Sequence, residues 1–363
     1  MGNLYIGLMS GTSLDGIDAV LAVPRGKRFD IRASLHRAFS PRLRRQLLAL
    51  QTAGPDEIRR AALTANELTR LYGAVVRSLL ARARVRASTV TAVGCHGQTI
   101  RHQPGAGYTL QLVNGALLAE LTGIDVVCDF RSRDIAAGGE GAPLASAFHS
   151  AVFGARDRNR AVVNIGGIAN VTNLPARGRA TGFDSGPGNC LMDAWIAARR
   201  RLPYDRGGAW AVQGRVVPRL LERLLADPYF RRSPPKSTGR ETFNLAWLRR
   251  RLARNERAQN VQATLLELTA LTIARGVRKY APDARQVLVC GGGARNRTLV
   301  ARLATLLPGR RVIVSDRAGI AAEHVEALAF AWLARGCLRR KPGNLPSVTG
   351  ARGPRILGAI YPA

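Results

Sequence analysis

The chain has 363 residues, 46% hydrophobic and 22% charged, and its 55 basic and 24 acidic side chains give a formal net charge of +31. This length favours two domains, and so many apolar residues exclude a disordered chain. No run of about 18 uncharged apolar residues occurs, and the N-terminus has no basic region before its apolar stretch. We therefore expect neither a transmembrane helix nor a secretory signal.

The first third of the chain begins with two apolar runs around a polar turn, LYIGLMSGTSLDGIDAVLAVP, which predicts a β-hairpin. Residues 41–84 have helical spacing of their leucines and valines. Two short apolar strands follow, in TAVGCHGQT and IDVVCDF, with a helix near 115–121 between them.

The rest of the chain opens with a second hairpin signal, RAVVNIGGIANVTNL, followed by helical spacing from 188 to 280. A strand (QVLVC), a glycine turn, a helix from about Arg295, a strand (RVIVS) and a helix (HVEALAFAWLA) complete it. Strands alternating with helices predict an α/β fold. Because the hairpins begin near residues 5 and 161, the spacing suggests a duplicated unit.

The five cysteines lie far apart and form no CxxC pair: Cys95, Cys128, Cys190, Cys290 and Cys337. Neither a zinc ribbon nor a disulfide framework is therefore indicated. Buried thiols in a reducing cytoplasm are the favoured interpretation.

The turn of the first hairpin, GTSLDGID, carries two glycines and two hydroxyls. Such a turn presents several backbone N–H groups to an anion, and Asp15 and Asp18 are suited to hold a hydrated Mg²⁺ beside phosphates. An ordinary polar hairpin turn is the alternative.

Two further glycine turns occur, in NIGGIANVT and in CGGG. Asn164, Gly166, Gly167 and Asn170 suit a close approach of the backbone to phosphate. Gly291–Gly293 connect a strand to a helix, where a base or ribose can lie against the backbone. Each turn alone is weak evidence, since glycines are common in hairpins.

The segment FDSGPGN holds Asp184 in what we predict to be a rigid Gly/Pro turn. Its carboxylate follows the apolar Phe183, and partial desolvation raises a carboxylate's pKa towards that of a general base. An aspartate that only stabilises an Asx turn is the alternative.

Polar residues that suit a sugar ligand follow the strand in CHGQT, where His96 and Gln98 can bind hydroxyls. A histidine in such a place is more often structural than catalytic. In DFRSRDIAAGGEGAP, Arg131 and Arg133 stand beside a glycine-rich loop, and arginine binds carboxylates bidentately.

Taken in order, these motifs together with PPKSTGRE, EALAFAWLA and PSVTGARGPRILGAIYP resemble the bacterial anhydro-N-acetylmuramic acid kinases over nearly the whole chain. The resemblance implies two RNase-H-like, actin-like ATPase domains flanking a nucleotide cleft. The first would span 1–132 plus about 340–363, and the second 133–339. Small departures are Ser185 in place of the family's more usual Thr, and Ala322 and Glu323 in place of Pro-Asp.

The activity that the resemblance implies is ATP-dependent phosphorylation of 1,6-anhydro-N-acetylmuramic acid at O6 with hydrolytic opening of the anhydro ring, in peptidoglycan recycling. It implies ATP and Mg²⁺ as cofactors and a cytoplasmic enzyme, and it leaves a homodimer open. Asp184 would be the base, Asp18 would hold the metal through water, and His96, Gln98, Arg131 and Glu326 would contact the sugar. The nucleotide would contact the residues of the three glycine turns: Gly11, Thr12, Ser13, Leu14, Asp15, Gly16, Ile17, Asp18, Asn164, Gly166, Gly167, Gly291, Gly292 and Gly293.

Two other function classes are compatible with the sequence. One is a different sugar kinase or ATPase of the same fold. The other, suggested by the arginine content, is a basic nucleic-acid-binding ATPase. The arginines are scattered and aromatic residues make up only 6%, so an anionic small substrate is the favoured partner.

Overall fold

The computed structural model describes residues 4–26 and 28–363. The chain divides into a first unit, Met1–Val152 with Glu323–Ala363, and a second unit, Phe153–Ala322. The sequence prediction put these divisions at 132/133 and near 340. In the structure, the segment that follows Arg133 and the helix that begins near residue 325 belong to the first unit.

A six-stranded sheet forms the centre of the first unit. Its strands, in order, are β13 (Ala359–Tyr361), β7 (Val126–Cys128), β4 (Val90–Cys95), β1 (Leu4–Met9), β2 (Gly16–Arg25) and β3 (Arg28–Ala38). β1 and β2 are antiparallel, as the hairpin signal predicted, and β3 extends them as a third strand that the sequence analysis did not predict. β4 and β7 run parallel to β1.

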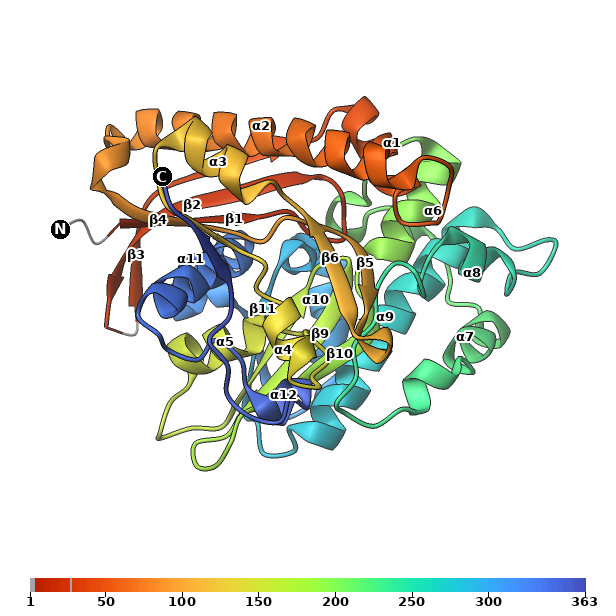
Figure 1. Ribbon diagram of the computed structural model, residues 1–363. Coiled ribbons are helices and arrows are strands. Elements are labelled where there is room, and N and C mark those ends of the chain that lie inside the picture. The colour runs from red at the N-terminus through yellow and green to blue at the C-terminus, as the bar shows by residue number, and fades with distance from the viewer. Residues whose placement is uncertain (1–3, 27) are drawn as a thin grey trace. The chain divides into compact units, whose positions relative to one another are not determined.

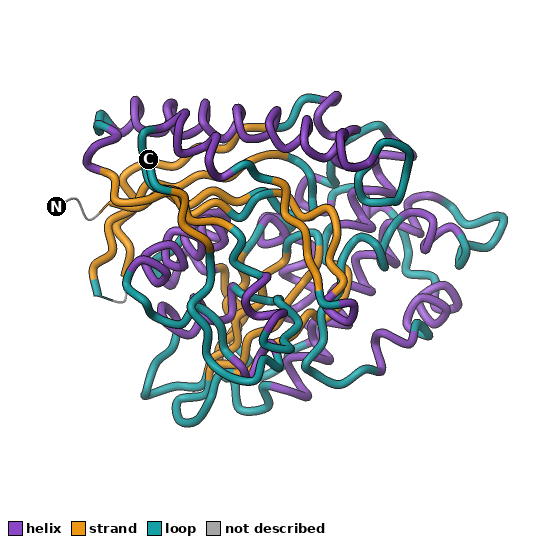
Figure 2. The backbone as a smooth tube through the Cα atoms, in the orientation of Figure 1, coloured by secondary structure: helices purple, strands orange, loops and turns teal. Residues whose placement is uncertain are grey.

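Helices cover both faces of this sheet, with α2 and α3 on one face and α11 on the other (Figure 1). Figure 2 traces the long helix α2 along the strands. A small hairpin, β5 (Gln98–Gln103) and β6 (Tyr108–Leu112), stands apart from the sheet. The helices are α1 (Pro41–Ala49), α2 (Glu57–Ala83), α3 (Gly115–Thr122), α4 (Ser132–Ala136), α5 (Ala145–Phe153), α11 (Val325–Leu338) and α12 (Pro346–Thr349).

Helix α11 approaches its face of the sheet unusually closely because two strand residues there are glycines. A Cβ atom on Gly7 would lie 1.8 Å from the carbonyl oxygen of Ala327, and one on Gly94 would lie 2.1 Å from that of Phe330. Both positions therefore require glycine for packing rather than for backbone freedom.

The second unit contains a five-stranded sheet with the same pattern. Its strands, in order, are β12 (Arg311–Val314), β11 (Gln286–Cys290), β8 (Arg160–Ile165), β9 (Ile168–Leu174) and β10 (Thr181–Pro187). β8, β9 and β10 form an antiparallel meander like β1, β2 and β3, while β11 and β12 run parallel to β8. The predicted duplication and the two-domain α/β fold class are confirmed.

One local prediction is wrong, because the first five residues of FDSGPGN, Phe183–Pro187, belong to strand β10 and not to a turn. Two glycines and a proline argue against a strand. Here the strand lies at the edge of the sheet, and its register shifts between Asp184 and Gly186, which accommodates them.

The helices of the second unit lie within the region where helical spacing was predicted, together with α10 after β11. Helix α9 packs on β9 and β10, and α10 packs on α9. They are α6 (Cys190–Arg200), α7 (Pro218–Leu225), α8 (Leu245–Arg249), α9 (Ala258–Tyr280) and α10 (Arg297–Leu306). Short 3₁₀ turns at Ala211–Gln213, Pro228–Arg231 and Gly292–Arg295 connect them.

All five cysteines are buried and free, as the sequence predicted. Among the described residues, no helix has the length and apolar character that crossing a bilayer requires.

Candidate active site

Asp184 belongs to a row of polar side chains that crosses the sheet of the second unit. It lies opposite Asn170 on β9, which lies opposite Asn164 on β8, which in turn lies opposite Cys290 on β11. Paired residues of neighbouring strands project from the same face. The next residue along β10, Phe183, packs with Val171 against Gly276 of α9, so the polar row faces away from α9.

The backbone and carboxylate of Asp184 are held by the segment that follows α7. Its N–H donates to the carbonyl oxygen of Lys236 at 3.2 Å, and its own carbonyl oxygen accepts from the Tyr229 hydroxyl at 2.6 Å. Oδ2 accepts from the N–H of Thr238 at 3.1 Å. Only 5% of Asp184 is exposed. The carboxylate is thus fixed in orientation, as a general base requires.

Lys236 places a second ionisable group beside this carboxylate. Its Nζ donates to the Tyr229 carbonyl oxygen at 3.2 Å and lies 4.6 Å from the centre of the Tyr229 aromatic ring. Burial lowers the pKa of Lys236 to about 8, and the positive charges of Arg232 and Lys279 act in the same direction, whereas Asp184 opposes them. This lysine lies in the PPKSTGRE motif, whose sequence alone indicates no role for it.

The glycine turn of the second hairpin is tied to the start of α6. The carbonyl oxygen of Gly166 accepts from the N–H of Asn189, and that of Gly167 accepts from those of Gly188 and Cys190. These bonds bring the turn NIGG and the beginning of α6 together at the end of β8.

The three glycines after β11 serve different purposes. Gly291 has a φ of 77°, and a Cβ there would meet the Asn164 side chain at 2.5 Å. A Cβ on Gly293 would meet the side chain of Ile165 at 2.3 Å, so both glycines are needed for packing. On Gly292 the nearest atom would be 3.9 Å away, so packing does not require a glycine there and its backbone is accessible to a ligand.

In the first unit, the turn GTSLDGID connects β1 to β2. Leu14 adopts a left-handed φ of 54° and is fully buried, as is Ile17, so neither side chain can contact a nucleotide. The Ser13 hydroxyl donates to Asp15 at 2.6 Å. Asp18 lies on β2, and its half-exposed carboxylate is 2.8 Å from Nδ1 of His36 on β3.

His96 and Arg131 contact each other directly. His96 Nε2 lies 3.1 Å from Nε and 2.9 Å from Nη2 of Arg131, while His96 Nδ1 lies 3.2 Å from the carbonyl oxygen of Ser10. Because Ser10 offers an acceptor and Arg131 offers donors, Nδ1 must carry the proton and Nε2 must accept. Burial lowers the pKa of His96 to about 3, helped by the Arg131 charge, so the ring is neutral.

Arg131 and Arg133 have different surroundings. Arg131 is half-buried, and its Nη1 donates to the carbonyl oxygen of Gly141 at 2.7 Å. Arg133 is exposed. Gln98 is fully buried, and its Nε2 donates to the carbonyl oxygen of Gly11 at 3.1 Å, which connects it to the first glycine turn.

Asp134, which the sequence analysis did not single out, holds the loop after Arg131 in place. It is fully buried, and its oxygens accept from the N–H of Gly141 at 2.9 Å, from Asn344 at 2.6 Å and from Thr349 at 2.8 Å. Thr349 belongs to the segment PSVTGARGP, and Asn344 shortly precedes it. The C-terminal motif therefore helps to hold this loop.

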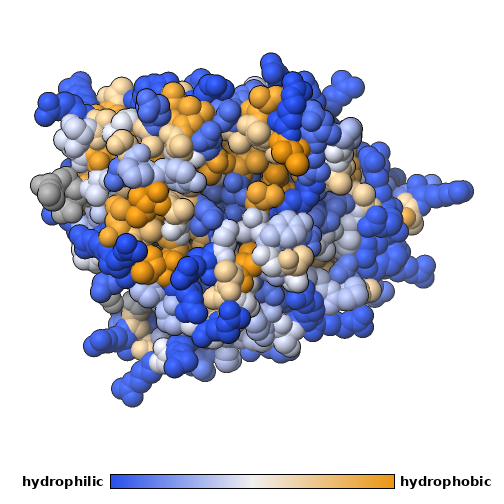
Figure 3. Space-filling view, in the orientation of Figure 1, coloured by the Kyte–Doolittle hydropathy of each residue, from blue (hydrophilic) through white to orange (hydrophobic). Residues whose placement is uncertain are grey.

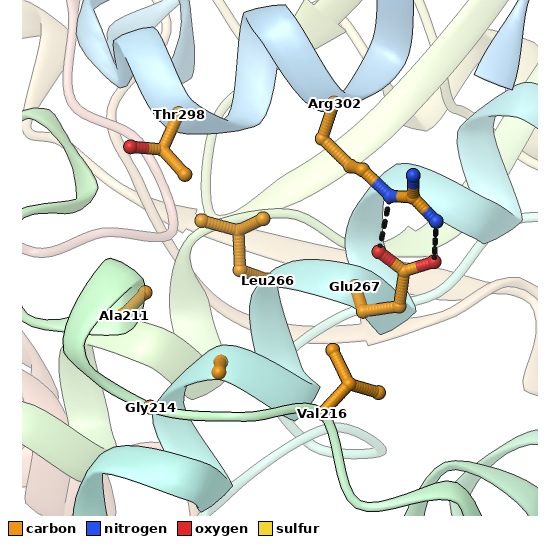
Figure 4. A pocket seen from close by; sticks show the side chains of 8 residues that line it. Ala211, Gly214, Val216, Leu266, Glu267, Thr298 and Arg302 are labelled. Carbon is orange, nitrogen blue, oxygen red and sulfur yellow. Dashed lines mark hydrogen bonds and ion pairs between the residues drawn. The ribbon is translucent and has the colours of Figure 1, made fainter. Parts of the chain in front are cut away.

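A cavity of about 300 Å³ lies in the second unit between α9, α10 and the 3₁₀ turn Ala211–Gln213. Figure 4 shows Arg302 paired with Glu267 through two bonds at its rim, of 2.6 and 2.8 Å. Leu266 and Val216 supply apolar walls, and Thr298 borders the cavity at the start of α10.

Comparison with known proteins identifies the family. The sequence profile described as anhydro-N-acetylmuramic acid kinase matches residues 3–363. The chain belongs to the anhydro-N-acetylmuramic acid kinase family. It is therefore an enzyme, a kinase of the transferase class, as the resemblance implied.

Curated members of this family are similar over their whole length. The protein of Nitrosomonas europaea is 56% identical over 361 residues, covering 99% of both chains. That of Variovorax paradoxus is 55% identical over 373 residues, covering 100% of both. Both are named anhydro-N-acetylmuramic acid kinase.

Solved structures that align with the chain are far more distant. An activator of 2-hydroxyisocaproyl-CoA dehydratase from Clostridium difficile has a TM-score of 0.47 at 15% identity, covering 93% of this chain and 97% of its own. A ROK family glucokinase from Streptomyces griseus has a TM-score of 0.41 at 16% identity, covering 92% and 99%. So distant a likeness says nothing about substrate.

Within this kinase family fold, each unit brings together some of the predicted site residues. The first unit holds the GTSLDGID turn, His96, Gln98 and Arg131, with Glu326 in the first turn of α11. The second unit holds Asp184 and the other two glycine turns. Asp134 and Lys236 are the additions made by the structure, and of these only Lys236 lies in a motif noted from the sequence, PPKSTGRE. Asn170 was expected near phosphate, and the structure places it opposite Asp184.

Proposed function

We propose that this kinase transfers the γ-phosphoryl group of ATP to O6 of 1,6-anhydro-N-acetylmuramic acid and opens the anhydro ring with water, giving N-acetylmuramic acid 6-phosphate. The observation that carries the proposal is the buried, oriented carboxylate of Asp184 in a chain of this family. Peptidoglycan recycling in the cytoplasm is the corresponding role.

The substrate explains why a base is needed. Its O6 has no hydroxyl hydrogen because O6 is tied to C1 in the anhydro bridge. In the proposed reaction, water attacks C1 and gives a proton to Asp184 while the C1–O6 bond breaks. O6 then takes the phosphoryl group, and ADP leaves with the electrons of the broken phosphoanhydride bond.

The glycine turns would bind the nucleotide. GTSLDGID and NIGG offer backbone N–H groups and hydroxyls for the phosphates. Gly292 offers an open backbone for the ribose, and the cavity bordered by Thr298, on the helix that follows, has apolar walls suited to the base.

A magnesium ion fits the residues present at the first turn. Mg²⁺ in kinases is usually held by one or two carboxylates, by waters and by the substrate's phosphates rather than by a protein cage. The half-exposed carboxylate of Asp18 suits such a contact through water. When bound, the ion would neutralise charge on the phosphates.

Arg131 is our choice for the lactyl carboxylate of the sugar, since its guanidinium is held in place by His96 and Gly141, whereas Arg133 is exposed. A pre-oriented guanidinium loses less freedom on binding a carboxylate. His96 and Gln98 then support the sugar site through Arg131 and Gly11, and Glu326 is proposed to contact the sugar hydroxyls.

Mass spectrometry of the product tests the reaction. After incubation with ATP, Mg²⁺ and anhydro-N-acetylmuramic acid, we expect the sugar to gain one phosphoryl group and one water molecule. A product that gains phosphate alone would contradict the ring-opening step. No product at all, from folded protein, would contradict the substrate assignment and favour another sugar kinase activity.

Asp184→Asn tests the base. Asn keeps the shape of the side chain but cannot take a proton, so turnover should fall about 10²–10⁴-fold while ATP affinity is retained. The exposed Asp283→Asn in the same unit is the control and should behave like the parent protein. Turnover of the Asp184 variant within threefold of the parent would refute the assignment.

The net charge of +31 is the observation that favours a nucleic-acid-binding ATPase as a second candidate. Random-sequence DNA titrated at several salt concentrations distinguishes the two functions. We expect at most weak binding, and a steep fall of affinity with salt would support the second candidate.

A further inference from the structure

Asn170 occupies the middle of the polar row described above, on the central strand of the meander β8–β9–β10. It lies directly opposite Asp184 on one side and Asn164 on the other, and all three side chains project from the face away from α9. Directly opposite residues have Cβ atoms about 4.5–5.5 Å apart. The amide of Asn170 is therefore a neighbour of the proposed base.

The side-chain oxygen of Asn170 is buried and has no hydrogen-bond partner among the residues that the structure describes. Only 8% of the residue is exposed. Buried amide oxygens are usually paired, and this one lies opposite the proposed base, where a bound water would supply the missing partner.

The other amide of the row differs in this respect. The Asn164 side-chain oxygen accepts from the Cys290 thiol at 3.6 Å, and it also borders Gly291, so that amide is used in packing the second unit. A hydrophobic residue at position 170 would fill the same place without leaving an unpaired oxygen. A structural role alone therefore does not explain why an amide is there.

A water that attacks C1 must present a lone pair to carbon and direct both of its hydrogens elsewhere. Two acceptors on one side of the water achieve this. The carboxylate of Asp184 and the amide oxygen of Asn170 are two acceptors on neighbouring strands of one sheet face.

We propose that the Asn170 side-chain oxygen accepts a hydrogen bond from the attacking water, whose other hydrogen points at Asp184. The proton passes to Asp184 as the water oxygen bonds to C1 and the C1–O6 bond breaks. Asn170 keeps its own protons throughout and only orients the water. This inference rests on the ring-opening reaction proposed above.

Asn170→Leu keeps the branched shape of the side chain and removes the acceptor, and Asn170→Ser is a second, smaller variant with a shorter hydroxyl. We expect both to lower kcat about 10–100-fold and to leave the KM values for ATP and sugar within threefold, because the water is not part of either ligand. Asn173→Ala, a half-exposed asparagine on the same strand, is the matched control.

Asn170→Asp provides a readout that a merely structural role would not affect. A second carboxylate opposite Asp184 makes ionisation of both unfavourable, so the acid limb of the pH–rate profile should move up by about one unit or more. An unchanged acid limb in a folded variant would show that residue 170 does not face the base.

Two outcomes separate this inference from the proposed function. If the parent protein forms the phosphorylated, hydrated sugar and Asn170→Leu and Asn170→Ser retain kcat within threefold, only the inference is overturned. If the parent protein forms no such product, the proposed function fails first. A fall in affinity for both ligands without a change in kcat would also overturn the role given to Asn170.

Discussion

At the scale of single residues, the hydrogen bonds around Arg131 explain why its neighbour His96 is not a candidate acid or base. His96 donates through Nδ1 to Ser10 and accepts through Nε2 from Arg131. With its pKa lowered to about 3 by burial and by the Arg131 charge, it stays neutral at any pH where a kinase would be assayed. It is a positioning residue that holds a cation.

The role that we propose for Arg131 leads to a prediction about substrate choice. Arg131→Ala removes one partner of a charge-assisted pair, worth roughly 1.5–3 kcal/mol, so the KM for anhydro-N-acetylmuramic acid should rise about 10–150-fold. The KM for ATP should hardly change. The preference for this sugar over the corresponding anhydro sugar without the lactyl group should disappear. Competition kinetics with both sugars measures that preference.

The exposed Arg133→Ala, two residues further on, is the matched control. If Arg131→Ala still discriminates between the two sugars as the parent does and Arg133→Ala does not, the carboxylate is bound by Arg133.

At the scale of elements, helix α11 is positioned by glycines of the strands beneath it. Gly7 on β1 and Gly94 on β4 let the carbonyl oxygens of Ala327 and Phe330 approach the sheet. Since Glu326 lies in the first turn of α11, the same close approach determines where that carboxylate stands.

Gly7→Ala should therefore destabilise the protein. A methyl group 1.8 Å from a carbonyl oxygen forces the helix outward, and overpacking of this kind costs about 1–3 kcal/mol or more. Urea denaturation measures the loss. Gly105→Ala is the control, because a Cβ there meets nothing within 4 Å and stability should stay within about 0.5 kcal/mol. Equal stability of the two variants would contradict the close packing of α11.

At the scale of the whole molecule, the positive charge is carried by arginines in both units, and hydrophilic residues predominate on the face shown in Figure 3. Three histidines have pKa values that burial lowers. Burial lowers the pKa of His96 and His149 to about 3 and that of His102 to about 4, with Arg131 contributing to the shifts of His96 and His102.

These histidines make stability depend on pH. In the unfolded chain they take up protons below about pH 6.5, whereas in the folded protein they stay neutral to about pH 4. Acid therefore favours unfolding, and stability present above pH 6.5 is lost as the pH falls. Between pH 6.5 and 5 the loss should be about 2 kcal/mol for each histidine.

Urea unfolding at pH 7 and pH 5 measures this loss. His102→Gln removes one of the three groups and should reduce the difference between the two pH values. Equal midpoints for the parent protein at both pH values would mean that the histidines are not buried as described.

From the sequence alone, the two hairpins, the long helices and the duplicated α/β pattern could be predicted. Each of these depends on local periodicity or on a turn motif, which neighbouring residues specify. The third strands of both meanders, β3 and β10, were not predicted, since glycine and proline in β10 oppose a strand and only pairing with β9 stabilises it.

Which side chains meet depends on the tertiary structure. Asn170 faces Asp184 because of strand register, and His96 meets Arg131 across 35 residues of chain. Asp134 accepts from Asn344 and Thr349 across 210 and 215 residues. Contacts over such separations depend on how the strands and loops pack, and no local pattern in the sequence encodes that packing.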